Sequence, residues 1–136
     1  MDKQRTARDI MKAPVISVKE DMLVVDVMKL LTRSHISGVP VVDDDGKLIA
    51  MVTNRLILHF AVSGNAVRTR VADVMSKELE IYGPTYSLDT PIGVLADRFA
   101  SSRINRVLIV EDDRVVGIIS RSDIIGEIER IYLSVS

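Results

Sequence analysis

The 136-residue sequence contains no cysteine and no tryptophan, and aromatic residues make up only 4% of it. The absence of cysteine excludes disulfides, thiol catalysis and cysteine-ligated zinc. No run of apolar side chains reaches six residues, whereas a membrane-spanning helix needs about 20. The polar first five residues do not have the pattern of a signal peptide. We therefore expect a cytoplasmic protein that is not associated with a membrane.

An excess of charge of one sign is also missing, because 18 basic residues face 19 acidic ones and the net charge is −1. A general polyanion binder normally has a basic surplus, and aromatic side chains for base stacking are scarce here. We therefore expect no nucleic-acid partner. Hydrophobic residues make up 47% and charged residues 27% of the chain, which is typical of a globular protein with its own core.

The sequence does contain an internal repeat, which decides how the rest is interpreted. Three segments return with offsets of 64, 68 and 67 residues: 8–11 as 72–75, 36–42 as 104–110, and 48–55 as 115–122. These offsets predict one repeat over residues 6–62 and a second over residues 70–133. Residues 63–69 are the predicted linker, because Gly64 and Asn65 favour a turn.

Each repeat has the same predicted order of strand, helix, strand, strand and helix. Apolar residues at helical spacing mark the first helix of each repeat, and they are Val24, Val27, Met28 and Leu31, then Ile92, Leu95, Ala96 and Phe99. Thr90 is the expected cap of the latter helix, with Pro91 at its first position. The remaining elements are expected at residues 15–18, 39–43, 47–53 and 54–62, and at 79–82, 106–111, 114–120 and 121–133. Acidic turns join the paired strands.

This pattern predicts an α+β fold of two β-α-β-β-α repeats. A three-stranded sheet with both helices on one face leaves its other face uncovered. We therefore expect the two copies to pack sheet to sheet, with pseudo-twofold symmetry.

Three motifs give the repeat a family resemblance. They are Asp-Ile-Met at 9–11 with Asp-Val-Met at 73–75, Ile-Ser-Gly-Val-Pro-Val-Val at 36–42, and Gly-Ile-Ile-Ser-Arg-Ser-Asp at 117–123. In this order and in two copies they resemble the cystathionine-beta-synthase (CBS) domain, which occurs in tandem pairs also called Bateman modules. The resemblance covers about nine tenths of the chain.

The resemblance implies a regulatory module rather than an enzyme. CBS pairs commonly bind AMP, ADP, ATP, NAD or S-adenosylmethionine in clefts between the repeats and signal to an attached or partner protein. It implies an adenine nucleotide as regulatory ligand, with no required cofactor, and a homodimer of pairs. The implied ligand residues are Ile16, Ser37, Gly38, Pro40, Asn105, Arg106, Ser120, Arg121, Ser122 and Asp123.

Asp123 is the candidate for the ribose, because a carboxylate can accept hydrogen bonds from both vicinal hydroxyls. Ser120 and Ser122 would line the same side. Ser-x-x-Asp before an apolar helix is also close to a capping box that only satisfies backbone donors. The two roles are compatible, and the sequence leaves both open.

Arginines near element ends are candidates for the phosphates. The family resemblance implies Arg106, with Asn105, as the preferred one, because phosphate ligands of the family occur at this position. Arg103 and Arg121 are further candidates, and an ordinary solvated arginine is the alternative for each. In the first repeat, Ile16 would contact the base, while Ser37 and Gly38 would offer hydroxyl and backbone groups. Ordinary packing at the start of a strand is the alternative there.

The corresponding positions of the first repeat depart from this pattern. Thr53 matches Ser120, but Leu56 stands where Asp123 stands, and Ala50 replaces Gly117. Since leucine accepts no hydrogen bond from a ribose, we predict one competent nucleotide site and one weak or silent site per chain. His35 and His59 are too isolated to predict a metal site.

Other function classes are weaker. No phosphate-binding glycine loop or Ser–His–Asp arrangement indicates an enzyme. A ligand-independent scaffold would have the same fold but no nucleotide response. The last helix has apolar residues on more than one side, which favours a helix-mediated homodimer or, alternatively, a well-buried terminal helix. Its apolar residues are Ile124, Ile125, Ile128, Ile131 and Tyr132. The regulated partner is not indicated.

Overall fold

The computed structural model describes residues 5–62, 68–79 and 84–134. They form two compact units. One unit comprises residues 5–15 and 84–134, and we call it the Asp123 unit. The other comprises residues 16–62 and 68–79, and we call it the Leu56 unit. Both are built from helices and strands together, which confirms the predicted α+β class.

The sheet of the Asp123 unit has three strands in the order β3-β4-β5. They are β3 (Thr85–Tyr86), β4 (Arg106–Glu111) and β5 (Arg114–Ser120). β3 is parallel to β4, and β4 pairs antiparallel with β5. Asp112 and Asp113 turn the hairpin with positive φ angles of 51° and 65°, the conformation that a two-residue turn requires. The predicted limits of β4 and β5 are confirmed.

The sheet of the Leu56 unit is a hairpin of β1 (Gly38–Val42) and β2 (Leu48–Thr53). The first strand expected in this repeat is reduced to one parallel bridge between Val18 and Val41. In the second repeat the first strand lies at β3 rather than at the expected 79–82, of which only Leu79 is described. Residues 63–67 of the predicted linker also lie outside the described residues.

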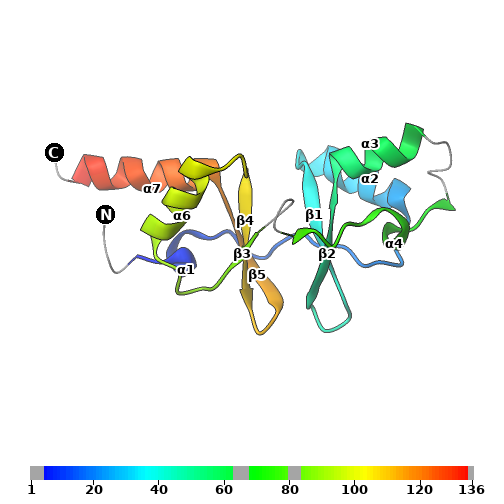
Figure 1. Ribbon diagram of the computed structural model, residues 1–136, viewed down its shortest axis with the longest axis horizontal. Coiled ribbons are helices and arrows are strands. Elements are labelled where there is room, and N and C mark those ends of the chain that lie inside the picture. Colours follow the sequence, from blue (N-terminus) through cyan, green and yellow to red (C-terminus); the bar gives the residue numbers. More distant parts are fainter. Residues whose placement is uncertain (1–4, 63–67, 80–83, 135–136) are drawn as a thin grey trace. The chain divides into compact units, whose positions relative to one another are not determined.

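Two longer helices lie on one side of each hairpin (Figure 1). They are α2 (Val24–Ser34) and α3 (Asn54–Val62) in the Leu56 unit, and α6 (Ile92–Ser101) and α7 (Arg121–Ser134) in the Asp123 unit. The predicted stripes are buried in two separate cores, most fully at Val24, Val27, Leu31, Ile92, Leu95 and Phe99. Pro91 is the N-cap of α6 rather than its first residue, and its extended backbone (ψ 145°) begins the helix without a side-chain cap.

The short helices that begin the two repeats are exchanged between the units. α1 (Ala7–Ile10) opens the first repeat but contacts α7 and β5 of the Asp123 unit. α4 (Val71–Val74) opens the second repeat but contacts α3 of the Leu56 unit. After α1, Lys12 forms a bridge with Ile118 of β5, and after α4 Ser76 forms the matching bridge with Met51 of β2. Each unit is therefore completed by the leading segment of the other repeat.

Among the helices of the described residues, none has both the length and the apolar character needed to cross a bilayer.

Candidate ligand-binding site

The predicted ribose carboxylate lies where β5 passes into α7. The Asp123 side chain is only 12% exposed. Its Oδ2 accepts a hydrogen bond from the Ser120 backbone N–H at 2.8 Å, and the Asp123 N–H donates to the Ser120 hydroxyl at 3.3 Å. The Ser120 and Ser122 hydroxyls lie 2.9 Å apart. The capping arrangement is thus present, and it fixes the carboxylate beside two hydroxyls at the start of a long helix.

The other carboxylate oxygen of Asp123 forms an ion pair with Lys12, a residue that the sequence analysis did not single out. Lys12 Nζ lies 3.2 Å from Asp123 Oδ1. The lysine backbone is held against β5, because its N–H donates to the Ile118 carbonyl at 2.9 Å and its carbonyl accepts the Ile118 N–H at 3.1 Å. Lys12 directly follows the repeated Asp-Ile-Met motif. That position was a usable signal, but nothing in the sequence shows which strand the segment joins.

The predicted phosphate residues of the Asp123 unit have different surroundings. Arg106 begins β4 and is partly buried, and this burial lowers the pKa of its guanidinium. Asn105 is exposed, and its carbonyl accepts the Arg121 backbone N–H at 3.2 Å. The Arg121 side chain donates to the Ser102 carbonyl at 2.6 Å and lies 5.8 Å from the centre of the Phe99 ring. Arg121 is therefore engaged with α6, which weakens its claim as a phosphate ligand.

The four predicted ligand residues of the first repeat all belong to the Leu56 unit. Ile16 is 44% exposed. Ser37 is also exposed, and its carbonyl accepts the Asn54 N–H at 2.8 Å. Gly38 and Pro40 are buried within β1. Packing within the strand and a contact with a ligand both remain open for these two residues.

The start of α3 shows what the Leu56 unit has in place of the carboxylate. Thr53 Oγ1 accepts the Leu56 N–H at 3.3 Å, so one half of the cap is retained. The reciprocal hydrogen bond, from the backbone N–H of Thr53 to the side chain at position 56, is not possible because leucine has no acceptor. The position that matches Lys12 is Ser76, which is uncharged. This end of the Leu56 unit offers neither the anion nor the cation of its counterpart.

The glycine that distinguishes the two units has a packing role. A Cβ at Gly117 would collide with Met11, whose Cγ and Cβ would lie 2.8 and 2.9 Å away. Gly117 therefore lets the leading segment approach β5 closely. Ala50 occupies the matching position of β2.

A buried carboxylate also joins the leading segment to α7. Glu127 is 5% exposed and accepts two hydrogen bonds from Arg5, at 3.0 and 2.9 Å. Arg130 adds two more to Oε1, at 3.2 and 2.7 Å. The hydrogen bonds from Arg5 and then from Arg130 lower the pKa of Glu127 to about 2. This cluster anchors the segment that carries Lys12.

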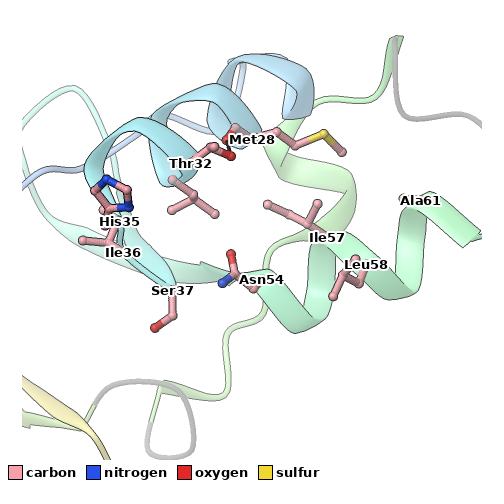
Figure 2. Close-up of a pocket in the computed structure, with 10 residues that line it drawn as sticks. Met28, Thr32, His35, Ile36, Ser37, Asn54, Ile57, Leu58 and Ala61 are labelled. Atoms are coloured by element: carbon pink, nitrogen blue, oxygen red, sulfur yellow. Dashed lines mark hydrogen bonds between the residues drawn. The ribbon is translucent and has the colours of Figure 1, made fainter.

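The Leu56 unit has a pocket of about 810 Å³ between α2 and α3 (Figure 2). Met28 and Ile57 point into the space between the helices, and His35, Ser37 and Asn54 lie at one end of it. His35 ends α2 in a left-handed conformation, with φ of 54°. No group of three or more metal-ligating side chains occurs among residues 5–62, 68–79 and 84–134.

Comparison with known proteins identifies both repeats. The sequence model of the CBS domain family matches residues 7–63 and 71–130. The crystal structure of the CBS domain pair of protein MJ0100, in complex with 5′-methylthioadenosine and S-adenosyl-L-methionine, is similar to the chain with a TM-score of 0.71 and 26% identity. That similarity covers 97% of this chain and 98% of the other.

Two curated relatives are much longer proteins. The A-adding tRNA nucleotidyltransferase of Geobacter sulfurreducens is 29% identical over 89% of this chain, which spans 13% of that protein. The 5′-AMP-activated protein kinase subunit gamma of Saccharomyces cerevisiae is 26% identical over 75% of this chain, which spans 33% of that protein.

Proposed function

Because the chain belongs to the CBS domain family and has two CBS domains in tandem, we propose that it is a regulatory module that binds an adenosine-containing ligand. The proposed ligand is an adenine nucleotide, with AMP, ADP and ATP first. Its output would pass through a partner protein or through a dimer of the chain. The observation that carries the proposal is the Asp123 carboxylate, held beside the Ser120 and Ser122 hydroxyls at the start of α7. The cytoplasmic location expected from the sequence stays a prediction.

The geometry at Asp123 suits a ribose. The cap uses only Oδ2 with one backbone N–H, and a carboxylate has about four acceptor positions. Oδ1 therefore keeps acceptor capacity for a sugar hydroxyl even beside Lys12. The adjacent serine hydroxyls add donors and acceptors. Arg106, at the start of the neighbouring strand β4, is the proposed phosphate ligand, with Asn105 beside it.

The similar proteins support the adenosine class. The domain pair of MJ0100 was crystallised with two adenosine compounds, and the yeast kinase subunit belongs to an AMP-activated enzyme. S-adenosylmethionine is therefore an alternative ligand, and NAD is a further alternative that the family resemblance implies. We propose that Ile16, Ser37, Gly38 and Pro40 of the first repeat contribute to the same ligand, as the family resemblance implies.

Thermal unfolding with millimolar AMP, ADP, ATP, NAD and S-adenosylmethionine tests the proposal. A ligand at about 100 times its dissociation constant adds roughly 2.7 kcal/mol to the free energy of unfolding. We expect Asp123→Ala to abolish this shift, whereas Leu56→Ala, at the matching position of the other unit, should keep it. A shift that survives in Asp123→Ala would contradict the assigned site. No shift with any compound would favour a ligand-independent scaffold.

We also propose that the chain forms a homodimer through its helices. Ile125, Tyr132 and Leu133 of α7 are 63%, 70% and 66% exposed, and Leu58 of α3, which matches Ile125, is 65% exposed. Exposed apolar side chains that cluster on helix faces commonly mark interfaces. Sedimentation should give a dimer at micromolar concentration that Ile125→Asp dissociates. A wild-type monomer would contradict the proposal.

A further inference from the structure

Lys12 places a positive charge at the carboxylate that we assign to the ribose. We propose that Lys12 makes the Asp123 site selective for adenosine ligands that carry a phosphate, over neutral or cationic adenosine compounds. This inference rests on the proposed function and adds the charge class of its ligand.

The backbone of Lys12 is held in place, whereas its side chain is largely exposed to solvent. Two backbone hydrogen bonds with Ile118 hold the residue on β5, and the Arg5–Glu127 ion pair anchors the segment before it. The Lys12 side chain is nevertheless 73% exposed, whereas that of Asp123 is 12% exposed. The ammonium group can therefore turn toward a ligand while its attachment to the unit stays in place.

Binding of a ribose changes the contacts of the Lys12 ammonium group. A sugar hydroxyl that donates to Asp123 Oδ1 shares or replaces the contact of Lys12 with that atom. In a nucleotide, the ribose diol and the 5′-phosphate are separated by only the sugar ring and one methylene group, a span that a lysine side chain can bridge. A phosphate then gives Lys12 a second anionic partner. Adenosine offers none, and the sulfonium of S-adenosylmethionine is repelled.

The Leu56 unit provides an internal contrast. Ser76 stands at the position of Lys12 and Leu56 at that of Asp123. The cation and the carboxylate are thus present together in one unit and replaced together in the other. The Leu56 unit therefore lacks both charged groups on which the proposed selectivity depends.

Calorimetric titration of the full chain with AMP, adenosine and S-adenosylmethionine tests the inference. We expect Lys12→Met to reduce the AMP-to-adenosine affinity ratio about tenfold, because one unit charge near a phosphate is worth about that factor in solvent-exposed surroundings. Adenosine affinity should stay within about twofold of wild type or rise. The AMP-to-adenosine affinity ratio of the wild type should also fall with increasing salt concentration, because salt screens the charge of Lys12.

Two variants make the result specific. Lys12→Arg keeps the charge and should keep most of the ratio. Arg8→Met removes another exposed ion pair of the same segment, Arg8–Asp89, and should leave the ratio unchanged. Adenosine binding that depends on Asp123, with the same ratio in Lys12→Met and wild type, would overturn this inference alone. Failure of the wild type to bind these three compounds, together with no stability shift from ADP, ATP or NAD, would overturn the proposed function and this inference with it.

Discussion

The two units have the same order of elements but bind the leading segment of the other repeat through different interactions. In the Asp123 unit, ion pairs join the leading segment to α7, through Arg5 with Glu127 and Lys12 with Asp123. The matching positions of the Leu56 unit are Thr69 with Phe60 and Ser76 with Leu56, which cannot form ion pairs. There the segment is held by backbone hydrogen bonds and apolar packing. Both units therefore have the same backbone bridge between leading segment and strand, but in the Asp123 unit the side chains add ion pairs.

The largest expected effect comes from removing the buried carboxylate of the ionic contact. Glu127→Ala removes the buried carboxylate that Arg5 and Arg130 share, and breaking a buried ion pair costs about 3 kcal/mol or more. We expect a loss of unfolding free energy at the low end of this range, because the side chains of Arg5 and Arg130 are partly exposed, at 32% and 48%. Urea unfolding measures the loss. Glu129→Ala, on the exposed side of the same helix, should change stability by less than about 0.5 kcal/mol. Equal losses in both variants would refute the distinction.

Acid should weaken the Asp123 unit through the same residue. The pKa of Glu127 is lowered from 4.5 to about 2, so its stabilisation is complete above pH 4.5 and is lost as pH falls through 2. From these values the loss between pH 5 and pH 3 is about 2 kcal/mol. The difference in unfolding free energy between wild type and Glu127→Gln isolates this part, since all other acids titrate in both proteins. A difference that does not vary with pH would contradict the assignment.

The close approach of the leading segment to β5 predicts a smaller effect. Gly117→Ala forces its methyl group against Met11, and overpacking of this kind costs roughly 1–2 kcal/mol. Gly126→Ala is the matched control, because its added Cβ has no atom within 4 Å apart from its chain neighbours and the nearby backbone of α7. The control should stabilise by up to about 1 kcal/mol, since alanine favours a helix over glycine. Thermal unfolding of the two variants should therefore shift in opposite directions.

The smallest expected difference concerns the two helix starts. Ser120→Ala removes one side of a reciprocal cap and should cost about 1 kcal/mol, whereas Thr53→Ala removes a one-way cap and should cost about half as much. Unfolding in the absence of ligand measures both. A larger loss for Thr53→Ala would show that the carboxylate adds nothing to the cap and is retained for another purpose.

The sequence predicted what short-range patterns control. The hairpin of β4 and β5 follows from β-branched runs around an acidic turn, and the buried stripes of α2 and α6 follow from helical spacing. The capping geometry of Ser120 and Asp123 was also predicted as one of two interpretations. Their role toward a ligand stays a prediction.

The exchange of the leading segments was not predictable in the same way. A helix of four residues such as α1 is too short for its periodicity to show which sheet it joins. The partnership of Lys12 with Asp123 depends on that pairing and was missed with it. Glu127 lies on a helix where a charged residue usually faces solvent, so nothing local marked it as buried.

The exchanged segments have a consequence for how such a chain can be divided. A cut between the repeats would give two fragments that each hold the first segment of the other's fold. Two copies of one such half could complete each other only by swapping these segments as a dimer. Joining the halves in one polypeptide makes the swap intramolecular, at a high effective concentration. Tandem duplication thereby frees the two copies to diverge, and one could keep its charged pair while the other lost it.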